Sequence, residues 1–151
     1  MALKHKVRIA IGLHEYKHIN EVVDILGQMH DIEIVADSEE AYHTIHAFKP
    51  DIAVLDYALS KIHPIELYEG IALAHANVHF VICVTEENYR IAQRVWKRRA
   101  SDFIFKPFHP AQFVNDINKI VRNVFNFKEI EELNERIKLL EKELKNLRIH
   151  L

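Results

Sequence analysis

Asp56, Thr85 and Lys106 each stand directly after a short apolar run, where a side chain can act at the edge of a sheet. The runs are residues 52–55, 80–84 and 103–105. A carboxylate in such a place can attack a phosphoryl donor and form an acyl phosphate. That reaction needs positive charge and hydrogen-bond donors around the transferred oxygens, which a lysine ammonium and a threonine hydroxyl supply. These three residues are therefore the first candidates for chemistry.

The three runs belong to a regular alternation of strand-like and helix-like segments. Apolar runs predict strands at residues 7–11, 32–36, 52–55, 80–84 and 103–105. Helical spacing predicts helices from about residue 19, after Ser38 as N-cap, at residues 65–74, at about residues 87–98 and after Pro110. Strands without polar interruptions are typical of a parallel sheet covered on both faces. We therefore predict an α/β fold, a doubly wound five-stranded parallel sheet with its chemistry at the carboxyl ends of the strands.

The segments around the three polar residues resemble the CheY-like receiver domain of response regulators. Residues 49–56, Lys-Pro-Asp-Ile-Ala-Val-Leu-Asp, resemble its third strand, residues 84–85 the end of its fourth strand, and residues 103–108, Phe-Ile-Phe-Lys-Pro-Phe, its fifth strand. The resemblance covers about residues 6 to 125 and implies the flavodoxin-like (βα)5 fold. It also implies that Asp56 is the phospho-acceptor, that Lys106 and Thr85 contact the phosphoryl group, and that Phe103 is the switch aromatic.

One part of the family's pattern is replaced in this chain. Receivers carry adjacent acidic residues at the end of the first strand, which hold Mg²⁺ together with the phospho-acceptor; Leu13 and His14 stand there instead. Mg²⁺ prefers carboxylate and water oxygens, so neither side chain is a good ligand. Glu15 is the remaining carboxylate that could join Asp56 as a metal ligand, and we expect unassisted phosphorylation to be severely weakened. The chain resembles an atypical or pseudo-receiver, and the alternative function is a phosphorylation-independent scaffold or a ligand- or protein-binding adaptor.

The end of the chain carries a heptad repeat. Its a positions are Ile130, Ile137, Leu144 and Leu151, and its d positions are Leu133, Leu140 and Leu147. This pattern predicts a parallel homodimeric coiled coil, in which Arg136 meets Glu141 and Glu143 meets Arg148 of the second copy. We predict a receiver-like domain at residues 1–125 and a dimerisation helix at residues 126–151, which the fifth helix enters without interruption. The alternative is a helix that folds back on its own domain.

The composition excludes several other classes of protein. No apolar run approaches the roughly 18 residues of a membrane span, and the N-terminus lacks a secretory signal, so we expect a cytoplasmic protein. A net charge of −2 gives no general attraction to nucleic acid. The single cysteine, Cys83, lies in an apolar run and is interpreted as a buried hydrophobic residue. Without a further nucleophile or a cofactor motif, we expect a signalling module with a histidine kinase or an effector protein as partner, and not an enzyme.

Overall fold

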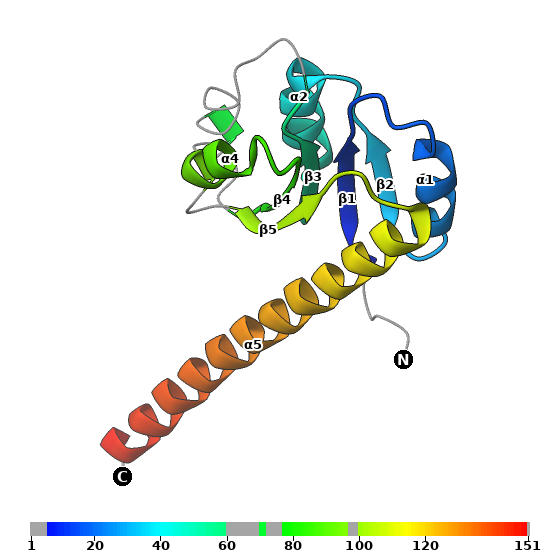
Figure 1. Cartoon of the computed structure of the whole chain (residues 1–151). Coiled ribbons are helices and arrows are strands. Elements are labelled where there is room, and N and C mark those ends of the chain that lie inside the picture. The colour runs from blue at the N-terminus through cyan, green and yellow to red at the C-terminus, as the bar shows by residue number, and fades with distance from the viewer. Residues whose placement is uncertain (1–5, 60–69, 72–76, 97–99, 151) are drawn as a thin grey trace. The chain divides into compact units, whose positions relative to one another are not determined.

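A five-stranded parallel sheet forms the central layer of the first compact unit of the chain, residues 1–117 (Figure 1). The structure is a computed structural model, which describes residues 6–59, 70–71, 77–96 and 100–150. The strands are β1 (Arg8–Gly12), β2 (Asp31–Ile34), β3 (Ile52–Asp56), β4 (His79–Val84) and β5 (Ala100–Phe105). They lie in the order β2-β1-β3-β4-β5 with every neighbouring pair parallel. This order confirms the predicted doubly wound fold, in which binding sites form where the strand order reverses, beside β1 and β3.

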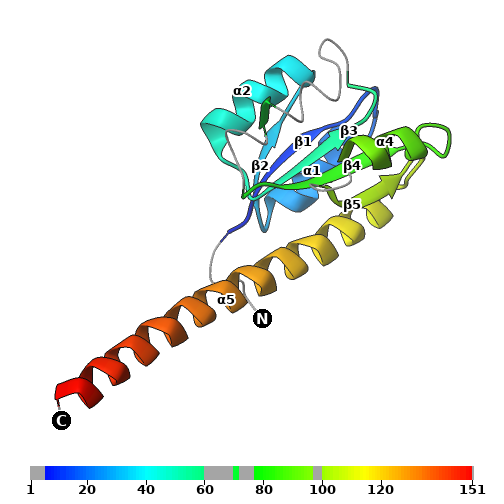
Figure 2. The same ribbon diagram turned by 90° about the vertical axis from the view of Figure 1, so that its left-hand side faces the viewer.

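Helices cover both faces of this sheet. They are α1 (Ile19–Gly27), α2 (Ser38–Phe48), α4 (Tyr89–Trp96) and α5 (Pro110–His150). Figure 2 shows α1 on one face of the sheet and α2 and α4 on the other. The helix predicted at residues 65–74 lies outside the described residues except for Gly70 and Ile71, which are helical.

The central strands are buried because they are covered on both faces. All five residues of β3 are buried, and β4 is buried from Phe80 to Val84. By contrast, the edge strand β2 exposes Asp31, Glu33 and Ile34. Strands that are buried on both faces read as continuous Val- and Ile-rich runs, which is why the periodicity located β3 and β4 closely. These two buried strands position the candidate residues, because Asp56 is the last residue of β3 and Thr85 directly follows β4.

The start of α2 differs from the expectation by one residue. Ser38 was the predicted N-cap, but the carboxylate of Asp37 accepts a hydrogen bond from the Glu40 amide at 2.8 Å, and Ser38 is the first residue of the helix. The prediction for Ser38 is therefore wrong. Both residue types are good N-caps, and the carboxylate also interacts favourably with the positive end of the helix dipole.

The chain forms two compact units, residues 1–117 and residues 118–151. α5 is one helix of 41 residues, so the expected continuity of the fifth helix into the heptad segment is confirmed. The boundary between residues 125 and 126 stays a prediction.

No helix in the described part of the chain combines the length and the apolar character that crossing a membrane requires.

The second unit is a helix with an exposed apolar stripe. The six described seam residues are 50% to 61% exposed: Ile130, Leu133, Ile137, Leu140, Leu144 and Leu147. Leu151 lies outside the described residues. The remaining positions of the heptads are mostly charged, so the stripe is narrow.

Candidate functional site

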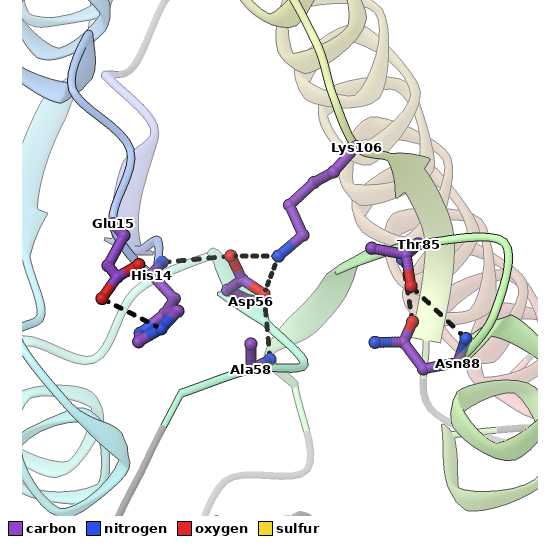
Figure 3. Close-up of polar contacts among 7 residues, drawn as sticks. All are labelled: His14, Glu15, Asp56, Ala58, Thr85, Asn88 and Lys106. Atoms are coloured by element: carbon purple, nitrogen blue, oxygen red, sulfur yellow. Dashed lines mark hydrogen bonds and ion pairs between the residues drawn. The ribbon is translucent and has the colours of Figure 1, made fainter.

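Asp56 is the last residue of β3, and its side chain is only 1% exposed. The Lys106 ammonium donates to both carboxylate oxygens, at 2.8 Å from Oδ1 and 3.0 Å from Oδ2. The main-chain amide of Ala58 donates to Oδ1 at 2.9 Å, and that of His14 donates to Oδ2 at 3.0 Å (Figure 3). A charge that water barely reaches is costly unless it is paired and hydrogen-bonded. Here a cation and two amides from three different segments supply those partners.

The sheet brings Lys106 to Asp56 although their strands are not neighbours. Asp56 lies beside Cys83 of β4, and Cys83 lies beside Ile104 of β5. Lys106 follows β5 directly, and its main-chain amide donates to the Val84 carbonyl at 2.7 Å, which fixes the end of that strand. The lysine side chain is long enough to span the intervening strand. Asp56 and Lys106, two of the candidate residues of the sequence, therefore lie in contact at the carboxyl edge of the sheet.

Thr85 follows β4 and lines the same open hollow as Asp56 and Lys106, with a volume of about 350 Å³. Among the described residues, no hydrogen bond joins the Thr85 hydroxyl to Asp56 or Lys106. The hydroxyl instead accepts a hydrogen bond from the Asn88 amide at 3.4 Å, and the Thr85 amide donates to Asn88 Oδ1 at 2.8 Å. Asn88 was missed in the sequence, although its spacing of three residues from Thr85 is that of a capping box.

Two loops complete the walls of the hollow. His14, Glu15 and Tyr16 come from the β1–α1 loop, and Pro107 and Phe108 from the β5–α5 loop. The Tyr16 hydroxyl donates to the Phe108 carbonyl at 3.4 Å, and the two ring centroids are 4.9 Å apart. Tyr16 thus ties the two loops together. The contact of Tyr16 with the β5–α5 loop was not predicted, because the sequence around an aromatic residue does not indicate which distant loop its ring will contact.

The residues around Asp56 do not fit Mg²⁺. Leu13 has an apolar side chain, and the main-chain amide of His14 already donates to Asp56 Oδ2. The Glu15 side chain is 84% exposed, and its carboxylate lies 3.8 Å from His14 Nε2. Within the described ranges, no three His, Cys, Asp or Glu side chains gather as a metal site. Mg²⁺ keeps several waters but needs one or two carboxylates as protein ligands, and the one buried carboxylate here already accepts hydrogen bonds from N–H donors at both of its oxygens. The assignment of Glu15 as a ligand stays a prediction.

Phe103 lies in β5, away from the walls of the hollow. Its half-buried ring packs against the core, and it meets the Tyr89 ring edge-on with 5.4 Å between centroids. Tyr89 is the first residue of α4 and also packs on Phe105, at 4.9 Å. The structure therefore places Phe103 beside the start of α4, and its role as a switch aromatic stays a prediction.

Cys83 is completely buried, which confirms its interpretation as a hydrophobic residue. Burial raises the pKa of its thiol above the ordinary value, and the negative charge of Asp56 raises this pKa further, while Lys106 acts in the opposite direction. The thiol is therefore held in its neutral, unreactive form.

Known proteins are similar to this chain in sequence. The model of the response regulator receiver domain matches residues 16–118, which is more than half of the chain and begins directly after Glu15. The chain is 27% identical to the chemotaxis protein CheY of Thermotoga maritima over 84 residues, covering 56% of this chain and 70% of CheY. It is 28% identical over 109 residues to the sensory transduction protein BceR of Halalkalibacterium halodurans, covering 72% of this chain and 47% of BceR.

Solved structures are similar in fold. The signal receiver domain of a putative Luxo repressor protein from Vibrio parahaemolyticus matches with a TM-score of 0.70 and 17% identity, over 85% of this chain and 97% of that domain. NtrX from Brucella abortus matches with a TM-score of 0.73 and 23% identity, over 85% of this chain but only 30% of NtrX. The chain thus spans less than half of the length of BceR and NtrX. The family match and the sheet order agree, and this chain belongs to the response regulator receiver domains of two-component signalling.

Proposed function

We propose that this chain is an atypical receiver module whose Asp56 site is held together by the protein's own donors, and that it signals by binding a partner without Mg²⁺-dependent phosphoryl transfer. One observation carries the proposal: the His14 amide and the Lys106 ammonium donate to Asp56 Oδ2. Receiver domains generally bind Mg²⁺ at an acidic site, but Leu13 and His14 supply no carboxylate for it. Without Mg²⁺, Lys106 is the one cation among the described residues that line the hollow, so the growing negative charge of an attack by Asp56 on a phosphoryl donor is offset less than in a metal-bound site.

A second candidate function keeps Asp56 as the phospho-acceptor. The hollow favours it, because Asp56, Thr85 and Lys106 all face one open space of about 350 Å³. In this candidate a histidine kinase supplies the phosphoryl group, Lys106 and Thr85 bind its oxygens, and Glu15 moves to complete a Mg²⁺ site with Asp56.

Acetyl phosphate separates the two candidates. The full chain is incubated with acetyl phosphate and Mg²⁺ and its intact mass is read before an acyl phosphate can hydrolyse, with Asp56→Asn as the control. The first proposal expects no adduct on the native chain and a gain of uptake in the double variant Leu13→Asp/His14→Asp. Uptake by the native chain that disappears in Asp56→Asn would overturn the first proposal and support the second.

We further propose that residues 126–151 form a parallel coiled coil with a second copy of the chain. The support is the narrow stripe of apolar residues at a and d positions, of which the six that the structure describes are each at least half exposed in the single chain. Charges beside the stripe complement one another in a parallel pair, since Arg136 at g meets Glu141 at e, and Glu143 at g meets Arg148 at e. The module would then act in the cytoplasm as a dimeric adaptor for an effector protein or a kinase, and not as an enzyme.

A further inference from the structure

The heptad frame of α5 can be followed for one repeat before Ile130. The a position of that repeat is Asn123 and its d position is Asn126. Both side chains are exposed in the single chain. The a and d positions of the repeat before it are Asp116 and Lys119, which are charged, so the frame supports a seam no earlier than Asn123. The two asparagines therefore stand directly before the aliphatic part of the stripe.

The same two turns of α5 bury a different face of the helix. Ile120, Val121 and Val124 are buried, with exposed fractions of 7%, 2% and 4%. Because each residue advances an α-helix by about 100°, Asn123 lies about 100° and Asn126 about 160° around the helix axis from Val124. The buried face thus leaves the side of the two asparagines open. That side is accessible to a second copy of the chain.

The aliphatic part of the stripe does not by itself fix how two copies align. Every a and d position from residue 130 to residue 151 is Ile or Leu. A shift of one helix by seven residues therefore keeps aliphatic side chains opposite one another over most of the seam. In coiled coils a polar Asn at an a position specifies the register and the number of strands, at a cost in stability. Asn123 is such a residue, and Asn126 adds a second asparagine in the next layer.

We propose that the self-association seam begins at Asn123, and that Asn123 and Asn126 meet the same residues of a second copy and fix a parallel, in-register dimer. In this arrangement each side-chain amide faces its own counterpart, and each offers both an N–H donor and a carbonyl acceptor. A shift by seven residues places Asn123 opposite Ile130, where the buried amide lacks a partner. In an antiparallel pair the asparagines of the two copies lie at opposite ends of the seam and cannot meet.

This inference rests on the proposed coiled coil and names the residues that set its alignment. A chain that stays monomeric would overturn both proposals. A dimer whose affinity and alignment do not depend on the two asparagines would overturn this inference alone. The mass of each variant in solution is therefore measured together with the readouts below.

The affinity of the dimer tests whether the two asparagines lie in the seam. In the full chain, Asn123→Leu/Asn126→Leu should lower the dissociation constant by roughly tenfold or more, because two leucine side chains become buried at a and d positions. Asn146→Leu makes the same substitution at a c position, outside the seam, and should leave the dissociation constant unchanged. Sedimentation equilibrium measures both constants. An unchanged constant in the double variant would place the start of the seam after Asn126 and overturn the proposal.

Disulfide exchange tests the alignment of the two copies. Two variants of the full chain, Ile137→Cys and Leu144→Cys, are made in a Cys83→Ala background, one of them is isotopically labelled, and they are mixed in a glutathione buffer. An in-register parallel dimer joins like positions, so intact masses should show mainly disulfides between two chains of the same variant. When Asn123→Leu/Asn126→Leu is added to both chains, disulfides between unlike variants should rise roughly tenfold, the factor that one unpaired buried polar group supplies.

The same control and two contrary results complete the disulfide test. Asn146→Leu should keep the native distribution of like and unlike disulfides. Unlike disulfides as frequent as like ones in the chain with native asparagines would show that the asparagines do not fix the alignment. An unchanged distribution in the double leucine variant, at a mass that shows a dimer, would equally overturn the proposal.

Discussion

The Lys106 ammonium contacts both oxygens of Asp56, at 2.8 Å and 3.0 Å, yet the two side chains are not equally buried. The carboxylate of Asp56 is 1% exposed, whereas the Lys106 side chain is 23% exposed. Loss of the lysine therefore leaves a buried charge with only two amide donors. Loss of the aspartate leaves an ammonium group that can turn to water.

This difference predicts an asymmetric pair of mutational effects. Lys106→Met should lower the free energy of unfolding by about 2 kcal/mol, less than for a fully buried pair because water partly reaches the lysine. Asp56→Asn should cost about 1 kcal/mol, and the double variant should cost less than the sum of the two, because the groups are in contact. Urea unfolding of the four proteins at pH 7 measures this cycle. Strict additivity would show that the contact contributes nothing to stability.

The coiled-coil proposal predicts that a lysine in the seam abolishes association. Leu140 at position d and Leu139 at position c are neighbours of the same type, 53% and 61% exposed in the single chain. Leu140→Lys should convert the dimer to a monomer, since a charge would be buried at the seam, while Leu139→Lys should leave the dimer intact. Light scattering gives the mass of each variant. Equal masses for the two variants, whether dimer or monomer, would contradict the assigned seam.

The parallel orientation predicts which charge reversal restores the dimer. Arg136→Glu places like charges opposite each other at two symmetric contacts and should weaken the dimer by roughly 1 kcal/mol. Adding Glu141→Arg should restore the affinity in a parallel pair. Adding Glu143→Arg should restore it only in an antiparallel pair, where g positions face each other. Sedimentation of the two double variants distinguishes the orientations, and recovery with Glu143→Arg alone would contradict the parallel arrangement.

The buried thiol predicts how stability depends on pH. Because the pKa of Cys83 is raised in the folded chain, the unfolded chain loses this proton first as the pH rises. The contribution of the thiol to stability is therefore complete below its ordinary pKa of about 8.5 and is lost above it, by at most about 1.4 kcal/mol per pH unit. Between about pH 8.5 and pH 10 the native chain should lose stability more steeply than Cys83→Ala under reducing conditions. Parallel slopes of unfolding free energy against pH would refute the buried, protonated thiol.

The strand segments, and the placement of Asp56 and Lys106 directly after two of them, could be predicted because both depend on local patterns, whereas the topology of the sheet was expected from the family resemblance. Continuous apolar runs mark strands that are buried on both faces, and the residue after each run must lie at the carboxyl edge of the sheet. The contact between Asp56 and Lys106 follows from that edge. The cap of α2 could not be assigned from sequence, because Asp37 and Ser38 are adjacent and both suit the position.

The main-chain contacts of the site could not be predicted. The His14 amide donates to Asp56, but the side chain of His14 carries no sign of this, and any residue other than proline offers the same amide at that position. The contact between Tyr16 and Phe108 likewise depends on how two loops meet, which no periodicity encodes. The contact between Asn88 and Thr85 could have been predicted, because a threonine followed three residues later by a polar side chain is a local pattern that indicates the start of a helix.

The central claim is that protein donors, and not Mg²⁺, hold Asp56 in this receiver. Titration of the full chain with Mg²⁺, followed through the amide signals of His14 and Ala58, tests it directly, because these two amides donate to the carboxylate. We predict that Mg²⁺ causes no saturable shift of these amide signals in the native chain. In the double variant Leu13→Asp/His14→Asp, which places an acidic pair at the end of β1, we predict a saturable shift of the amide signals of residues 14 and 58. A saturable shift in the native chain that is lost in Asp56→Asn would contradict the account.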